Sequence, residues 1–206
     1  MISRDSKYPL LVYSHGYGGN MDMATYFLRG FALQGMIIAI IEHADGTATS
    51  TVLSDGSRLN FHPFRLSLRD SLQFRSKEIH EAVDYLPSLF PGCLDRIFVG
   101  GHSYGATSAL IASQERSHGI SGLILHDPAL KMGAGCLELP TKIPTVSYVS
   151  DEYCWAGVRC GDATYHVHGA FHCNFLDIPF WAPLWILRLI SLTSRAAGPV
   201  NPVKVH

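Results

Sequence analysis

The segment Gly101-His102-Ser103-Tyr104-Gly105 has the residue types and spacing best suited to covalent chemistry. It follows the run Arg96–Gly100 and precedes the small-residue stretch Ala106–Leu110, which predicts a strand, a sharp turn and a helix. Such a turn holds the serine hydroxyl clear of the sheet, and its glycines allow the tight backbone path without a Cβ clash. Serine is a weak nucleophile that needs a base and a group to orient that base. The pattern therefore predicts Ser103 as a catalytic nucleophile.

Candidate partners for this serine follow other expected strands. Asp127 comes directly after the apolar run 122–126, and His172 lies four residues past the last expected strand. A glycine-rich loop, 15–19, follows the first one. Active groups gather at the carboxyl ends of parallel strands. A serine on such a strand-turn-helix segment is called a nucleophile elbow. In folds that use this elbow, the catalytic residues follow one another along the chain in the order Ser, Asp, His, which is the order found here.

These residues predict acyl transfer through a covalent intermediate. Ser103 would attack an ester carbonyl while His172 takes its proton and later returns it to the leaving alcohol. Asp127 would hold the imidazole in one tautomer and stabilise the imidazolium. The backbone N–H groups of Tyr17 and Tyr104 would stabilise the oxyanion. All of these groups belong to the protein, so no cofactor is implied.

Short apolar runs alternate with helical patterns along the chain. The expected strands are 10–14, 36–41, 97–99, 122–126, 144–149 and 164–168, and the expected helices are 20–33, 68–86, the elbow helix and about 174–193. Asn20 is expected to cap the first helix, and Pro87 and Pro91 to end the second. The polar stretch 43–63 is expected to be a long excursion. This alternation predicts an α/β fold with a mostly parallel sheet covered by helices on both faces.

Composition limits the classes of protein that fit. The 206 residues have a hydrophobic fraction of 47%, a charged fraction of 16% and a net charge of −1. We expect a single domain, 1–206, with loose ends at 1–7 and 196–206. No basic cluster is present, which argues against nucleic acid as a partner. The polar start lacks the apolar core of a signal peptide, which favours a cytoplasmic protein; a fragment that has lost its leader would fit a secreted one.

Four segments resemble one known family when taken in chain order. They are Tyr8-Pro9-Leu10-Leu11-Val12-Tyr13-Ser14-His15-Gly16, Ile41-Glu42-His43-Ala44-Asp45, the elbow at 101–105, and Gly169-Ala170-Phe171-His172-Cys173-Asn174-Phe175. Together they resemble the platelet-activating factor acetylhydrolases, α/β-hydrolases that cleave short or oxidised acyl chains from phospholipids without calcium. The similarity runs from about Tyr8 to Asp177. The Glu-His pair and the His-x-Asn-Phe segment are its more distinctive parts.

The resemblance implies a fold, an activity and site residues. It implies a compact α/β-hydrolase fold and a serine esterase acting on phospholipid-like esters. The family's serine, acid and histidine map onto Ser103, Asp127 and His172, and its oxyanion amides onto Tyr17 and Tyr104. The chain departs from the family in three ways. The family's strands before Tyr8 are missing, the connection to the elbow strand is shorter, and a tyrosine replaces an aliphatic residue at position 17.

Several assignments keep an alternative. Asp151, which ends the strand after Asp127, is a rival acid, and the resemblance favours Asp127. His166 and His168 form an H-x-H-x3-H run with His172, which could be read as a metal site, but no further ligand motif lies nearby, so ordinary strand residues are favoured and no metal is predicted.

Alternative interpretations also remain for the activity and for the apolar stretch 175–190. A general carboxylesterase for small soluble esters would fit the same residues, and so would an inactive hydrolase fold used for binding. The apolar stretch 175–190 is interrupted by charge and proline, which disfavours a membrane span. It is expected to be a core helix, or a segment making transient contact with a lipid surface. The sequence does not indicate an oligomeric state.

Overall fold

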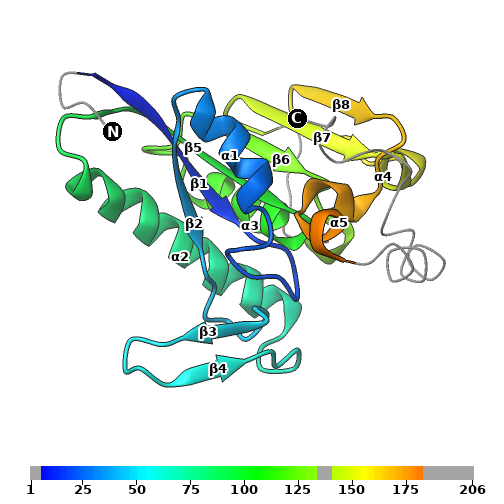
Figure 1. The fold of residues 1–206 in the computed structure, drawn as a ribbon, viewed down its shortest axis with the longest axis horizontal. Helices are drawn as coiled ribbons and strands as arrows, with labels where there is room; N and C mark the ends of the chain where they lie inside the picture. The colour runs from blue at the N-terminus through cyan, green and yellow to red at the C-terminus, as the bar shows by residue number, and fades with distance from the viewer. Residues whose placement is uncertain (1–5, 134–140, 183–206) are drawn as a thin grey trace.

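The computed structural model describes residues 6–133 and 141–182, and all elements below belong to these residues. They include a six-stranded sheet with the order β2-β1-β5-β6-β7-β8 (Figure 1). Every neighbouring pair in it is parallel. The strands are β1 (Tyr8–Ser14), β2 (Ile37–Ile41), β5 (Leu94–His102), β6 (Gly122–His126), β7 (Thr145–Ser150) and β8 (Ala163–Val167). The predicted α/β fold with a mostly parallel sheet is confirmed.

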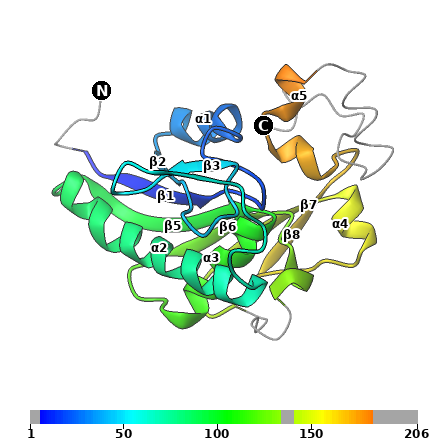
Figure 2. The same ribbon diagram turned by 90° about the horizontal axis from the view of Figure 1, so that it is seen from below.

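Helix α1 (Thr25–Leu33) covers one face of this sheet, and α2 (Leu68–Leu89) and α3 (Tyr104–Glu115) cover the other (Figure 2). The described residues also form the short helices α4 (Asp151–Trp155) and α5 (Ile178–Trp181) and the 3-10 turns η1 (Leu130–Gly133) and η2 (His172–Phe175). Strand β1 shows why the apolar runs are continuous. Leu10 and Val12 pack with side chains of α2 and α3, whereas Leu11 and Tyr13 pack with side chains of α1. Side chains alternate along a strand, so a strand buried on both faces must be apolar throughout.

The strand order reverses beside β1. The chain passes from β1 to β2 on one side and returns to β5 on the other, before continuing outward to β8. Such a reversal leaves a crevice outside the carboxyl ends of the two central strands, where α/β proteins place their sites. Here the loop after β1 meets the turn after β5, and a Cβ added to Gly16 would lie 3.3 Å from Ser103 Cβ. The topology therefore brings two distant segments together.

Three expected elements differ in detail. The polar excursion contains an antiparallel hairpin, β3 (Ser50–Val52) with β4 (Arg58–Asn60). The first helix begins at Thr25, because Asn20 Oδ1 accepts a bond from the amide of Asp22 and forms a turn instead of the cap. The second helix passes through Pro87 and ends at Leu89. The strand at 122–126 has the predicted bounds.

Part of the expected C-terminal helix lies outside the described residues. Within 174–182 the structure shows η2 and α5 in place of one continuous helix. Outside the described residues lie the remainder of the predicted helix, the second half of the expected lipid-contact segment 175–190, residues 1–5 of the expected loose end 1–7, and the expected loose end 196–206. No helix within 6–133 or 141–182 is long and apolar enough to cross a membrane.

Candidate active site

Ser103 lies at the turn between β5 and α3, in a backbone conformation that residues other than glycine rarely adopt. Its φ is 58° and its ψ is −119°, so the surroundings must hold it there. The amide of Ser103 donates to the carbonyl of His126 (2.9 Å), and its carbonyl accepts from the amide of Ala129 (3.1 Å). These bonds anchor the turn to the end of β6, which also carries Asp127.

Two glycines make this turn sterically possible. A Cβ on Gly101 would lie 2.5 Å from the carbonyl carbon of Gly105, and a Cβ on Gly105 would lie 2.1 Å from the carbonyl oxygen of Ser14. Both neighbours are backbone atoms, which cannot rotate away. The glycines therefore allow α3 to approach the elbow and β1 closely, as the sequence pattern suggested.

The three residues predicted as a triad meet in one line. Ser103 Oγ lies 2.9 Å from His172 Nε2, and His172 Nδ1 lies 3.1 Å from Asp127 Oδ2. Asp127 is fully buried, and its other oxygen accepts from the amide of Ser150 at 2.7 Å. An imidazole that donates from Nδ1 to a carboxylate presents its free Nε2 to the serine hydroxyl. The arrangement can accept a proton from Ser103.

The rival acid, Asp151, faces a different histidine. Its Oδ1 lies 2.5 Å from His166 Nε2, and its Oδ2 accepts from the amide of Gly169 at 3.0 Å. Asp151 thus braces the turn that leads to His172, whereas Asp127 contacts His172 itself. This geometry favours Asp127 as the acid, and the assignment remains a prediction about catalysis.

The glycine-rich loop after β1 is held in a fixed orientation. The carbonyl of Gly16 accepts bonds from His15 Nδ1 (2.8 Å) and from the amide of Gly19 (3.1 Å). Carbonyl and N–H point in opposite directions across a trans peptide, so the N–H of Tyr17 points away from these two partners. Tyr104 opens α3, where the first amides have no carbonyl partner within the helix. Both predicted oxyanion donors therefore lie on backbone that flanks Ser103.

A buried ion pair supports this loop from below. Arg75 of α2 and Asp45 are both buried, with Arg75 Nε 2.9 Å from Asp45 Oδ2, and Arg75 also donates to the carbonyl of His15 at 2.6 Å. Burial alone would raise the pKa of Asp45. The Arg75 guanidinium and the hydroxyl groups of Ser71 and Thr47 have the larger combined effect, so the pKa of Asp45 is lowered. Burial also lowers the pKa of Arg75. Neither residue was predicted to have a role, and the signal that could have indicated one was an arginine at a helical position facing the sheet.

The histidines near the loop act as braces in this structure. His43 is buried, and burial lowers its pKa well below the usual range, so it stays neutral. It contacts Ser14 Oγ through Nε2 (2.7 Å) and Glu78 through Nδ1 (2.6 Å). His15 Nε2 lies 3.1 Å from Glu42. These contacts tie the end of β1 to β2 and α2.

His102 packs beneath the elbow and holds the backbone of the base. Its Nε2 donates to the carbonyl of His172 at 3.0 Å, and the two rings lie 4.3 Å apart. Burial and the neighbouring His172 lower the pKa of His102 well below its usual range. It is therefore neutral, and its role here is to hold the position of His172.

Tyr153 is a site residue that the sequence analysis missed. Its ring stacks on the ring of His172, with centroids 4.8 Å apart and planes 3° from parallel. Its hydroxyl lies near Ser103, and burial raises its pKa, which keeps the phenol protonated. Tyr153 belongs to α4, which begins directly after β7. Its position after a strand end was the one signal that could have identified it.

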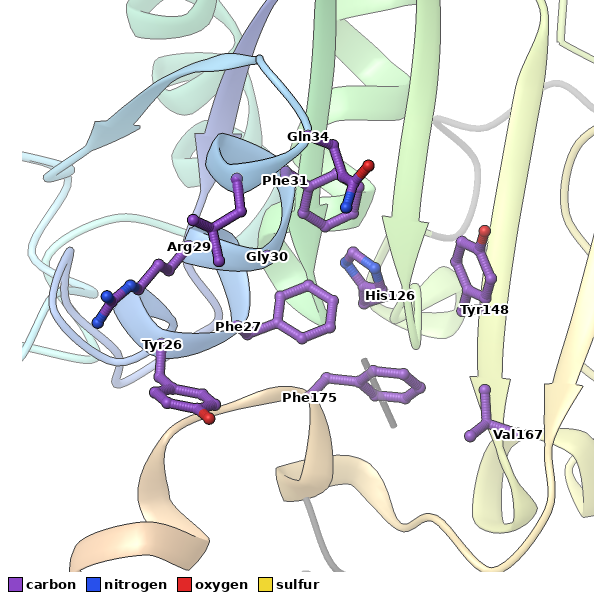
Figure 3. A pocket seen from close by; sticks show the side chains of 11 residues that line it. Tyr26, Phe27, Arg29, Gly30, Phe31, Gln34, His126, Tyr148, Val167 and Phe175 are labelled. Atoms are coloured by element: carbon purple, nitrogen blue, oxygen red, sulfur yellow. The ribbon is translucent and has the colours of Figure 1, made fainter. Parts of the chain in front are cut away.

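Two cavities lie near these residues. A small one of about 170 Å³ is lined by Ser103, His172, the loop 15–19 and Leu176. A larger one of about 720 Å³ lies between α1 and strands β6 and β7, lined by Phe27, His126, Tyr148 and Phe175 (Figure 3). The large cavity has neither Ser103 nor His172 in its lining, so the small one is the candidate acyl site.

The sheet, the elbow and the order of the site residues define the class of the molecule as the α/β-hydrolase fold. Solved structures support this. A ferulic acid esterase from Streptomyces cinnamoneus matches with a TM-score of 0.66 and 18% identity, covering 96% of this chain and 63% of that one. A structure described as two metagenome-derived lipolytic enzymes, LipS and LipT, matches with a TM-score of 0.57 and 13% identity, covering 92% and 95%.

Comparison of the sequence points to a narrower group of proteins than comparison of the fold does. Residues 1–89 match the family model described as platelet-activating factor acetylhydrolase, isoform II. A platelet-activating factor acetylhydrolase of Cavia porcellus is 23% identical over 243 residues, covering 97% of this chain and 55% of that protein. The predicted resemblance to this family is confirmed. The chain spans about half of the length of the curated relative it matches.

Proposed function

We propose that this protein is a serine esterase that works through Ser103, His172 and Asp127 and an acyl-enzyme. The observation that carries the proposal is the continuous line from the Ser103 hydroxyl through His172 to buried Asp127, at 2.9 and 3.1 Å. A serine at an elbow, a base in contact with it and an acid that orients the base are the parts that nucleophilic catalysis needs.

The reaction proceeds in two halves. Ser103 Oγ attacks the ester carbonyl while His172 Nε2 takes the hydroxyl proton. The tetrahedral intermediate collapses, and the imidazolium gives that proton to the leaving alkoxide, which departs as an alcohol. Water then attacks the acyl-enzyme with His172 as base, which releases a carboxylic acid and restores Ser103. Asp127 stabilises the imidazolium in both halves.

The oxyanion is stabilised by backbone donors. The N–H groups of Tyr17 and Tyr104 come from the braced loop and from the first turn of α3. Tyr104 also lies at the positive end of the α3 dipole. Loss of one such donor costs about 2.7–4 kcal/mol of barrier in a well-studied protease. The bonds that fix the Gly16 carbonyl therefore also support the chemistry.

The proposed substrates are short or oxidised acyl esters of phospholipid-like molecules. The family match over 1–89 and the similarity to a platelet-activating factor acetylhydrolase support this class. The small cavity of about 170 Å³ beside Ser103 favours a short acyl group. A preference for small soluble esters is the competing specificity, because the same triad would serve it.

A substrate panel on the purified protein tests the proposal. Acetyl-phospholipid, long-chain phosphatidylcholine, and water-soluble acetyl and butyryl esters are compared for kcat/KM. We expect the acetyl-phospholipid to be the best substrate and the long-chain lipid the poorest. Higher kcat/KM for the soluble esters would replace the lipid assignment with a general carboxylesterase.

Ser103→Ala is the control in every assay. It should reduce turnover by at least about 10³-fold while leaving the far-UV circular dichroism unchanged. Retention of a tenth of the activity would contradict covalent catalysis by Ser103. A folded wild-type protein without activity on any ester would favour a binding role.

A further inference from the structure

Asp151, His166 and His168 form a second cluster of ionisable groups beside the active site. One ligand atom from each lies within 4.8 Å of the ligand atoms of the other two. His166 is on β8, the last strand of the sheet, and His168 follows two residues later. Asp151 comes from the start of α4, directly after the neighbouring strand β7. The cluster therefore joins two adjacent strand ends.

A structural ion pair does not account for the whole cluster. Asp151 and His166 already form a hydrogen-bonded pair at 2.5 Å, which needs no third member. The exposed His168 nevertheless packs its ring 3.9 Å from the ring of His166. The two imidazoles and the carboxylate therefore lie close enough together for a single cation to contact all three.

The donor set selects a class of metal ion. Two imidazole nitrogens and one carboxylate oxygen suit Zn²⁺ and its neighbours in the first transition row, whereas Ca²⁺ and Mg²⁺ prefer oxygen ligands throughout. Ligand atoms around a tetrahedral ion with bonds of about 2.0–2.1 Å lie closer together than 4.8 Å. The exposed side chain of His168 can rotate inward to close the difference.

We propose that Asp151, His166 and His168 bind a divalent first-row transition-metal ion such as Zn²⁺, with water as the fourth ligand. The ion takes the place of the proton between Asp151 Oδ1 and His166 Nε2. If that imidazole is neutral, its proton moves to Nδ1 and the ion binds the Nε2 lone pair. If the imidazole is charged, one proton passes to solvent for each ion bound.

The site is connected to the catalytic residues through the backbone. Asp151 Oδ2 accepts from the amide of Gly169 (3.0 Å), and the amide of Asp151 donates to the carbonyl of Ala170 (2.9 Å). These residues lead directly to His172. The residue before Asp151, Ser150, donates to Asp127. Binding through Oδ1 leaves Oδ2 on Gly169, so the ion would clamp the turn on which the base rests.

The test is a titration with Co²⁺, whose visible absorption reports coordination by nitrogen and oxygen ligands. The wild-type protein should bind one Co²⁺ ion per chain, Zn²⁺ should displace it, and Zn²⁺ should raise the thermal midpoint. His168→Ala should weaken binding by at least about tenfold, because it removes a direct ligand. His168 is exposed, so this variant should fold, and circular dichroism verifies that it does.

Two further variants make the result decisive. His62→Ala removes another exposed histidine from a loop after the hairpin and should bind Co²⁺ as the wild type does. His166→Ala should lose binding as His168→Ala does. The proposal is overturned if the wild type does not bind Co²⁺, or if all three variants retain or lose binding equally. The readout is binding, so it stands apart from any failure of the esterase assays.

Discussion

At the scale of single residues, the reactivity of Ser103 depends on neighbours that come from separate segments. His102 holds the backbone of His172, Asp127 holds its ring from Nδ1, and Tyr153 lies flat against its face. The base is therefore constrained from three directions. A ring fixed in this way needs little reorganisation when it takes the serine proton, which is how pre-organised sites lower a barrier.

Tyr153 gives a test at this scale. Tyr153→Phe keeps the stack on His172 and removes the polar hydroxyl near Ser103, so kcat should fall by up to about tenfold with KM unchanged. Tyr153→Ala also removes the stack and should lower kcat further. Wild-type kcat in both variants, measured on the best ester of the panel, would show that Tyr153 only fills space.

At the scale of elements, the site depends on how closely α3 approaches β1. Gly105→Ala should lower the free energy of unfolding by about 3 kcal/mol, because its Cβ would meet the Ser14 carbonyl oxygen at 2.1 Å. Gly30→Ala on α1 is the matched control. Among the described residues, no atom outside the adjacent residues and the helix's own backbone lies within 4 Å of its added Cβ, so helix propensity should stabilise the protein by about 0.5–1 kcal/mol. Urea unfolding measures both, and equal effects would contradict the packing argument.

Elements also show what could be predicted from the sequence. Strand β6 matched its predicted bounds because 122–126 is an apolar run next to turn residues. The hairpin β3–β4 was missed, since three-residue strands are too short to show a period. Asn20 was predicted as a cap, but its side chain closes a local turn instead.

Ser103, Asp127 and His172 were predicted from a motif and from their order in the chain. The residues that hold the site in place were not predicted. The Asp45–Arg75 pair joins residues 30 apart in the sequence, and Tyr153 of α4 stacks on His172, which follows β8 in the chain. The pairing of Asp151 with His166 likewise needs β7 and β8 to be neighbours. Such contacts depend on tertiary structure, which no local pattern contains.

At the scale of the whole molecule, a buried carboxyl makes stability depend on pH. Glu78 Oε2 accepts from His43 and Oε1 from the amide of Ala44, yet burial dominates and raises the pKa of Glu78 to about 7. The folded state therefore holds this proton more tightly than the unfolded state. The contribution is complete below the unfolded pKa of about 4.5 and is lost as the pH rises through about 7.

The resulting prediction concerns the free energy of unfolding between pH 5 and pH 8. The wild type should lose up to about 3 kcal/mol over this range from Glu78, and Glu78→Gln should lose that dependence. Glu81→Gln, an exposed change on the same helix, should keep most of it. Urea unfolding at several pH values measures all three. An unchanged pH slope in Glu78→Gln would contradict the assignment.

The most direct test of the central claim is the rate at which a fluorophosphonate labels Ser103, located by mass spectrometry. The wild type should label at Ser103, Asp127→Asn should label at least about 10²-fold more slowly, and Asp151→Asn should stay within about tenfold of the wild type. A folded wild-type protein that does not label, or a larger loss in Asp151→Asn than in Asp127→Asn, would contradict the account.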